Sequence, residues 1–218
     1  MFVEPFLAVA ARPEPPIDTL ALALAAEFRE VDEGAAVTRL DKLGEEVVEA
    51  REAFSGPGSG IDALREVLAV RHGFSGDERR YDHPQNSMLD VVLERRRGLP
   101  ILLSVLYLAI AQRAGIPLCG VGLPGHYVVG DLRPGPPVLI DPFADGKPVS
   151  PQSWRDVRAW GPHETALRIL NNLVASFGRR ADLVRTIQAA ELRLALPLEP
   201  SSVEVLRIEL DALRARLN

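Results

Sequence analysis

The chain has 218 residues, of which 47% are hydrophobic and 25% are charged, so it can form a sizeable core in one globular domain with an appendage. Its net charge of −5 argues against nonspecific binding to nucleic acid or to an acidic membrane, because both attract a basic excess. The longest apolar run, Val105–Ala111, is far short of the roughly 18 residues that a membrane-spanning helix needs.

Cysteine and histidine usage limits the chemistry further. Cys119 is the one cysteine, which excludes an internal disulfide and any paired-cysteine metal motif. No two histidines have the i, i+4 spacing of a helical metal site. The first apolar residues follow no basic region, unlike a secretory signal. We therefore expect a soluble, cytoplasmic protein without metal or cofactor.

Three helices are expected in the first third of the chain. Asp18 is a plausible N-cap for the first helix, and the apolar spacing predicts a second helix over residues 34–54. A Gly-Pro-Gly-Ser-Gly turn follows, and Ser59 can cap a third helix, Ile61–His72. Gly73 stands where a helix usually ends.

Two helices are expected in the middle. A short one should run over Met88–Arg97, capped by Asn86 or Ser87. A long one should run over Pro100–Ala114, since proline is favoured in the first turn of a helix. Its residues up to position 111 are apolar except Ser104, so it must be covered on nearly all sides.

From Leu118 onward the sequence predicts short strands. These strands should pair antiparallel, because the segments that connect them are too short for parallel crossovers. We expect strands at Leu118–Leu123, His126–Gly130 and Val138–Ile140, a helix from Ser150 through Trp160, and tail helices near residues 165–177, 181–195 and 202–217.

His126 and Asp141 are the histidine and carboxylate whose positions suggest chemistry. They stand on neighbouring predicted strands and can meet across the sheet. The carboxylate would accept from one ring nitrogen and leave the other as a base. A thiol or hydroxyl at the start of a helix would complete a catalytic set. A purely structural pair is the alternative.

The segment RYDHPQNSMLDVVLERRRGLPILLSVLYLAIAQRAGIPLCGVGLPGHYVVG, with the later IDPF, resembles the bacterial SirB-type branch of the transglutaminase-like superfamily. The resemblance is strongest over residues 73–143. It implies an α+β fold with a papain-like, transglutaminase-like core, N-terminal helices and a small antiparallel sheet. Residues 1–160 would form the helical and core part. Residues 161–218 would form a tetratricopeptide-like tail packed on it.

The resemblance places His126 and Asp141 on the catalytic histidine and aspartate of the superfamily. Counting back from the Gly-Ile-Pro at residue 115, the catalytic cysteine falls at Pro100, which has no nucleophile. The SirB-type branch shares this replacement. Ser104, one turn later, is expected to donate to the Pro100 carbonyl, and Cys119 is expected to be a buried inert thiol, although either could approach His126 in space.

A polar segment precedes the long helix and crowds the approach to the presumed cleft. Asn86 and Arg96 are its candidate binding residues, since arginine can bind a carboxylate or phosphate with two parallel hydrogen bonds. A solvated helix end is the ordinary alternative. The other candidates in this segment are Tyr81, Asp82, Glu94, Arg95 and Arg97.

Three functions remain open from the sequence. The first is a noncatalytic protein that binds a protein or peptide, but not nucleic acid or membrane, in the old cleft with help from the tail. The second is an active acyl-transfer enzyme or peptidase that combines His126 and Asp141 with a different nucleophile or an activated water. The third makes the tail alone the functional surface. The sequence defines neither the partner nor the oligomeric state.

Overall fold

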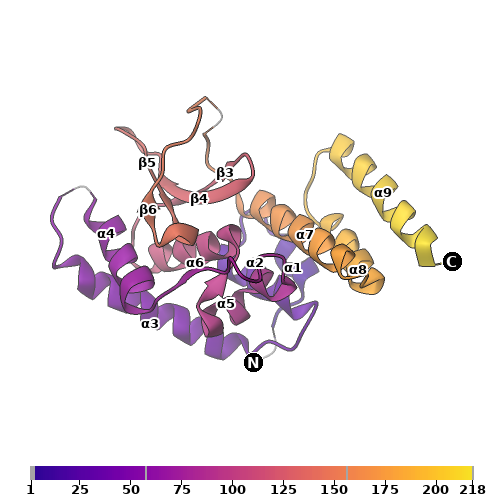
Figure 1. Ribbon diagram of the computed structural model, residues 1–218, viewed down its shortest axis with the longest axis horizontal. Helices are drawn as coiled ribbons and strands as arrows, with labels where there is room; N and C mark the ends of the chain where they lie inside the picture. The colour runs from indigo at the N-terminus through magenta and orange to yellow at the C-terminus, as the bar shows by residue number, and fades with distance from the viewer. Residues whose placement is uncertain (1–2, 57, 156, 218) are drawn as a thin grey trace.

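The computed structural model describes residues 3–56, 58–155 and 157–217, which form a helical body with a small sheet on one side (Figure 1). The helices that begin the chain lie in the body. They are α1 (Phe6–Ala10), α2 (Ile17–Ala26), α3 (Glu33–Arg51), α4 (Ser59–Arg65) and the π-helical η1 (Glu66–Arg71), which continues α4.

Three of the predicted caps are wrong, and two of them lie in these first helices. Helix α2 begins at Ile17 after Pro16, and Asp18 lies inside its first turn. The Asp18 side chain is buried, and Arg113 of another helix compensates its charge, with 2.8 Å between Oδ2 and Nη1. Ser59 is the first residue of α4, and Gly58 occupies the cap position.

The middle of the chain contributes β1 (Ser75–Gly76), the 3₁₀ turn η2 (Pro84–Ser87), α5 (Leu89–Arg95), β2 (Arg97–Gly98) and α6 (Pro100–Arg113). Helix α6 is buried from Pro100 to Tyr107, as its apolar sequence predicts. Helix α5 is shorter than predicted: its N-cap is Met88, and it ends because Arg96 adopts a left-handed conformation with φ 58°.

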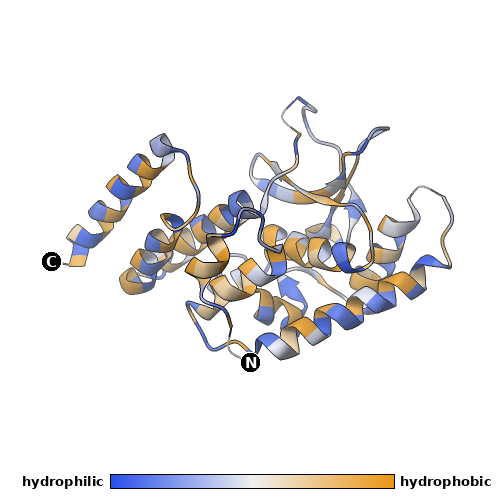
Figure 2. Cartoon of the chain, turned by 180° about the vertical axis from the view of Figure 1, so that it is seen from behind, coloured by the Kyte–Doolittle hydropathy of each residue, from blue (hydrophilic) through white to orange (hydrophobic). Residues whose placement is uncertain are grey.

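Three helices and a final 3₁₀ turn complete the body: α7 (Pro162–Arg179), α8 (Leu183–Arg193), α9 (Pro200–Arg214) and η4 (Ala215–Leu217). Phe177 of α7 packs on Phe28, with ring centroids 5.4 Å apart. Leu210 of α9 packs in a small cluster with Ile187 of α8. Hydrophobic and hydrophilic residues alternate along α9 (Figure 2).

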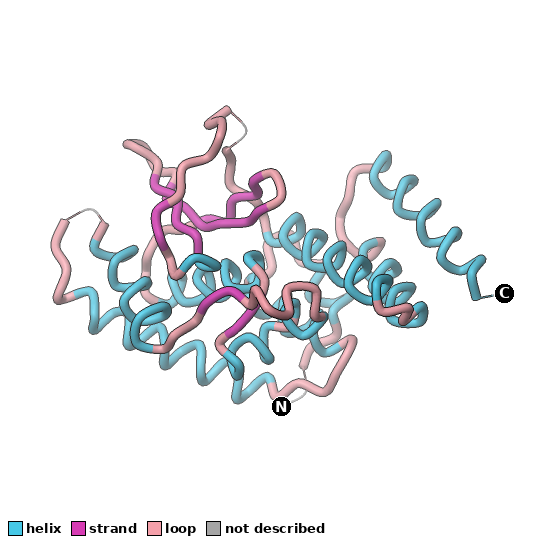
Figure 3. The backbone as a smooth tube through the Cα atoms, viewed as in Figure 1, coloured by secondary structure: helices cyan, strands magenta, loops and turns pink. Residues whose placement is uncertain are grey.

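The main sheet has four antiparallel strands in the order β3 (Cys119–Leu123), β4 (His126–Asp131), β5 (Val138–Asp141) and β6 (Lys147–Pro148). The antiparallel prediction is therefore confirmed, and the strands gather on one side of the molecule (Figure 3). Alternate residues face opposite ways: Tyr127 and Val129 join the main core, whereas Val128 belongs to a smaller cluster on the other face.

A second, two-stranded sheet pairs β1 with β2 in parallel, with Gly76 opposite Gly98. These two strands were not predicted, because each has only two residues and carries no alternating pattern. They bring residues 75–76 beside the chain that leads into α6.

The predicted helix from Ser150 through Trp160 is wrong for the residues of this segment that the structure describes. The segment is irregular, and Trp160 ends it by pairing with the edge of the sheet, where its N–H donates to the Gly120 carbonyl at 2.9 Å. Trp154 is about half exposed. Within the described ranges, the helices are all too short or too polar to cross a membrane.

Candidate functional site

His126 and Asp141 lie side by side at one end of the main sheet. His126 begins β4 and Asp141 ends β5, and 2.7 Å separates His126 Nε2 from Asp141 Oδ2. The other carboxylate oxygen accepts the N–H of Phe143 at 2.9 Å, which caps the 3₁₀ turn η3 (Pro142–Ala144). The carboxylate is thus held at both oxygens. The predicted contact across the sheet is therefore present. It involves Nε2, so Nδ1 is the ring nitrogen that does not contact Asp141.

The start of α6 lies under the start of β4. Ser104 is fully buried, and its hydroxyl donates to the carbonyl of Tyr127, the neighbour of His126, at 3.3 Å. The expected bond from Ser104 to the Pro100 carbonyl is therefore replaced by one to β4, because this strand lies directly across the helix. Pro100 stands one helical turn before Ser104 on the same face.

Phe143 connects this helix start to the histidine. Its ring covers the backbone of Gly76, whose partner in the small sheet, Gly98, lies two residues before Pro100. The same ring and the His126 imidazole are perpendicular, with centroids 6.4 Å apart and planes at 90°. The Phe143 ring therefore lies between His126 and Gly76, the strand partner of Gly98 in the segment that leads into Pro100.

Tyr81 and Phe143 form what we call the aromatic wall of this region. Their rings meet edge to face with centroids 5.9 Å apart, and Tyr81 is 45% exposed. The His126 side chain beside them is 29% exposed, so solvent reaches the imidazole. The wall was not predicted as a unit, since its two residues are 62 positions apart.

Arg168 of α7 is a site residue that the sequence reasoning missed. Its guanidinium lies over the rings of Tyr127 at 5.8 Å and Trp160 at 5.6 Å, and it donates to the Leu123 carbonyl at 3.5 Å. Leu123 is opposite His126 in the sheet register. Partial burial lowers the pKa of Arg168. Among the described residues, no carboxylate pairs with this guanidinium.

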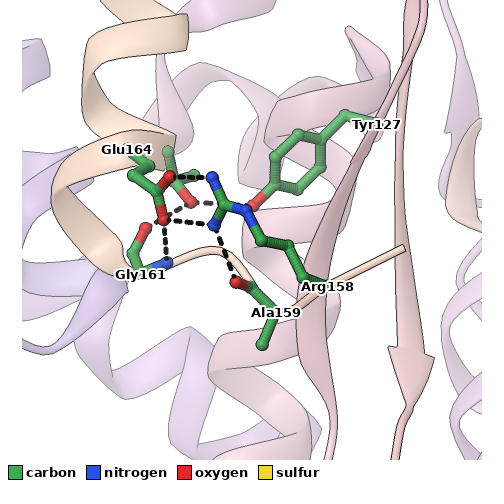
Figure 4. A network of polar contacts seen from close by, with 6 residues as sticks. Tyr127, Arg158, Ala159, Gly161 and Glu164 are labelled. Carbon is green, nitrogen blue, oxygen red and sulfur yellow. Dashed lines mark hydrogen bonds and ion pairs between the residues drawn. The ribbon is translucent and has the colours of Figure 1, made fainter. Parts of the chain in front are cut away.

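A polar network fixes the start of α7 against β4 (Figure 4). Thr165 donates to the Gly161 carbonyl at 2.9 Å, so the hydroxyl of Tyr127 must donate to Thr165, at 2.7 Å. Glu164 accepts the Gly161 N–H at 3.0 Å and pairs with Arg158. Burial raises the pKa of Tyr127 to about 12. This network sets the position of Arg168, one turn further along α7.

The candidate binding residues Asn86 and Arg96 have backbone partners. Asn86 is fully buried, and its side-chain Nδ2 donates to the Arg80 carbonyl at 2.7 Å. The backbone carbonyl of Asn86 accepts the N–H of Leu99 at 3.1 Å. Arg96 is exposed and donates to the His72 carbonyl at 3.1 Å. Both stabilise the loops that lead into α6, and their ligand-binding role stays a prediction.

Cys119 is remote from His126 along the sheet. It pairs with Gly130, whereas His126 pairs with Leu123, four residues along β3 and so about 13 Å away at 3.3 Å per residue. The thiol donates to the Gly130 carbonyl at 3.3 Å. Burial and the nearby Asp131 carboxylate raise its pKa, which keeps the thiol protonated at neutral pH.

The part of the chain that the structure describes contains no cluster of three or more histidine, cysteine, aspartate or glutamate side chains placed to hold a metal ion. The candidate site comprises the His–Asp pair, the proline at the start of α6, the aromatic wall and Arg168. These residues offer one imidazole, one carboxylate and one guanidinium.

A helical body whose long central helix begins beside a His–Asp pair on an antiparallel sheet defines a transglutaminase-like class of domain. The sequence model of the Transglutaminase-like superfamily matches residues 34–188, and the chain belongs to this superfamily. The match includes α7 and with it Arg168.

Several curated relatives are similar over part of their length. A UPF0162 protein of Xylella fastidiosa is 35% identical over 164 residues, covering 66% of this chain and 58% of that protein. F-box only protein 21 of Homo sapiens is 29% identical over 171 residues, covering 68% of this chain and 27% of that protein. The chain thus spans less than two thirds of either relative. No solved structure matches it.

Proposed function

We propose that this chain is a noncatalytic protein that binds a protein or peptide segment in the former catalytic cleft of its superfamily, assisted by the C-terminal helices. The observation that carries this proposal is Pro100 at the start of α6, where the resemblance puts the catalytic cysteine. Proline offers neither a nucleophilic atom nor an ionisable group. The partly exposed His126 and Asp141 beside it remain available as hydrogen-bonding groups.

The residues around the pair suit a peptide. Aromatic side chains and arginine are enriched in the parts of protein surfaces that bind other proteins, because they supply large contact areas and several donors. Tyr81 is such an aromatic residue, and Arg168 has no carboxylate partner among the described residues. An acidic side chain or a chain terminus of the peptide would fit this guanidinium.

The alternative is an active acyl-transfer enzyme or peptidase, and the 2.7 Å contact between His126 and Asp141 is the observation in its favour. This reading needs an attacking atom. The Ser104 hydroxyl is buried and bonded to the Tyr127 carbonyl, and the Cys119 thiol lies at the far end of β3. An activated water would then have to serve as the nucleophile. We therefore place this function second.

Three finer assignments belong to the same proposal. We assign the chain to the SirB-type branch, on the motif block around α6. We infer a tetratricopeptide-like tail for residues 161–218, because α7 and α8 pack on each other across a short turn and α9 exposes Val205 and Ile208. We further infer a cytoplasmic protein that binds neither nucleic acid nor membrane, from its acidic charge and single cysteine.

Peptide-array binding tests the proposal. An array of random nonapeptides is probed with the full chain, and the strongest binders are measured by fluorescence anisotropy. Tyr81→Ala and Arg168→Gln should each weaken binding at least tenfold. Val70→Ala, at an exposed apolar residue of η1, is the matched control and should leave binding unchanged. Equal effects of the cleft and control variants would refute the cleft as the binding site.

Activity measurements separate the two functions. Wild type and His126→Ala are assayed for ammonia release from a glutamine peptide with an added amine, and for hydrolysis of a fluorogenic peptide. We expect the same background in both proteins. A wild-type activity that His126→Ala abolishes, without loss of thermal stability, would favour the enzyme instead.

A further inference from the structure

A cavity lies between the end of α2, the turn η2 and the junction of α7 with α8. Its volume is about 310 Å³. Cavities of this size are at the lower end of those that hold small ligands. Its walls come from both ends of the described chain, because Phe28 and Phe177 line it together.

The floor of this junction cavity is apolar. Phe28 and Phe177 pack with ring centroids 5.4 Å apart, and Met88 completes the surface. Phe177 and Met88 are 4% and 3% exposed, so these side chains are fixed by the core around them. The Arg185 guanidinium lies over the Phe177 ring, 5.9 Å from its centroid. A hydrocarbon group placed beside it on Phe28 would leave water for an apolar surface.

The rim of the cavity is cationic. Arg29, Arg180 and Arg185 line it with one carboxylate, that of Asp182, which already pairs with Arg185 at 3.2 Å. Arg29 is paired with Asp90 outside the cavity.

Arg180 is the cation of this rim that lacks a carboxylate among the described residues. Its Nη1 donates to the Asp82 carbonyl at 2.8 Å and lies 3.4 Å from the Ser176 carbonyl. The carboxylate of Asp82 does not neutralise it, because that group pairs with Arg179 at 2.6 Å. A guanidinium held by backbone carbonyls keeps several donors free for an anion.

His83 adds a neutral donor to the same rim. Its Nδ1 accepts the N–H of Gln85 at 3.3 Å, which leaves the proton of the neutral ring on Nε2. Burial lowers the pKa of His83, and the charges of Arg180, Arg95 and Arg80 lower it further. These arginines therefore create a positive field at the imidazole, which a bound anion would reduce.

We propose that the junction cavity binds a small amphipathic carboxylate, with its hydrocarbon part on Phe28 and Phe177 and its carboxylate at Arg180 and His83. Neither His126 nor Asp141 lines this cavity, and its proposed ligand does not depend on the proposed function. Because its walls belong to the N-terminal body and to α7, an occupant stabilises their packing and raises the melting temperature.

Octanoate is the probe, and octylammonium and acetate are its controls for charge and for the apolar part. Calorimetric titration and thermal unfolding are done on the full chain at pH 7. Octanoate should bind at least tenfold more tightly than either control and should raise Tm. If octylammonium binds as tightly as octanoate, the cationic rim has no role in binding. If acetate binds as tightly as octanoate, the apolar floor has none. Either result overturns the proposal.

Two further measurements locate the bound probe. Arg180→Gln should weaken octanoate at least tenfold, whereas Arg207→Gln, at an exposed arginine of α9 outside the cavity, should leave it unchanged. If Arg180→Gln does not fold, the NMR titration of His83 in wild type replaces it, with His83→Gln identifying the resonance. Octanoate should raise the pKa of His83, and octylammonium should not. Octanoate binding without this change overturns the assignment to the junction cavity.

Discussion

Phe143 covers Gly76 so closely that a Cβ atom built on the glycine would lie 2.5 Å from the ring. This glycine does not have a positive φ, so space and not backbone conformation requires it. The contact holds Phe143 between the small sheet and His126, which gives the candidate site one of its walls.

Gly76→Ala should therefore destabilise the fold by about 1–3 kcal/mol, the usual cost of overpacking a well-packed position. Denaturant unfolding measures the change. Gly178→Ala is the control, because nothing lies within 4 Å of its added Cβ in α7. We expect that control to stabilise the protein by about 0.5–1 kcal/mol. Similar effects at the two glycines would contradict the packing described for Phe143.

Asp141 should matter for stability as well as for the site, because its two oxygens hold His126 and the N–H of Phe143. Asp141→Ala loses both contacts, and we expect a cost of about 1–2 kcal/mol, in the range of a lost helix cap. Asp141→Asn keeps one acceptor for the Phe143 N–H and should cost less. Urea unfolding of both variants, alone and with His126→Ala, gives the coupling between the pair. A coupling free energy of zero would mean that the contact between His126 and Asp141 does not contribute to stability.

Cys119 provides a pH-dependent test, since burial and Asp131 raise the pKa of its thiol. The thiolate is the reactive form, so alkylation by iodoacetamide should be slow at pH 7 and should increase about tenfold per pH unit up to at least pH 9. The urea-unfolded chain is the control and should react faster at every pH up to its own, lower pKa. Rapid labelling of the folded protein at pH 7 would restore Cys119 as a candidate nucleophile.

The central helix and the three longer strands of the main sheet could be predicted because their determinants are local, whereas the two-residue β6 was not predicted. Pro100 fixes the start of α6 and a long apolar run follows it, while the strands of the hairpin are five and six residues long and are separated by a Pro-Gly turn. The meeting of His126 with Asp141 followed from adjacent antiparallel strands. In each case neighbouring residues determine the structure.

The residues that were missed depend on contacts between distant segments. Arg168 reaches the site because α7 packs beside β4, and no pattern within α7 indicates that neighbour. The same holds for Trp160, whose pairing with Gly120 replaces the helix expected before it. Helix-like composition between residues 150 and 160 gives no information on the edge of β3, which determines how this segment ends.

Asp18 illustrates this limit and leads to the last prediction. It resembled a helix cap, yet it is the buried partner of Arg113, which also pairs with Asp41 at 2.7 Å. The side chain of Asp18 is 7% exposed and that of Asp41 is 56% exposed.

The two partners of Arg113 should therefore contribute unequally to stability. Asp18→Ala leaves a partly buried guanidinium with a single, solvent-exposed carboxylate, and we expect a loss of about 3 kcal/mol, the low end for breaking a buried pair. Asp41→Ala removes an exposed partner and should cost less than about 1 kcal/mol. Denaturant unfolding in 0.05 M and 0.5 M salt distinguishes them further, because salt screens the exposed pair more strongly. Equal losses in the two variants would show that burial does not set the strength of this contact.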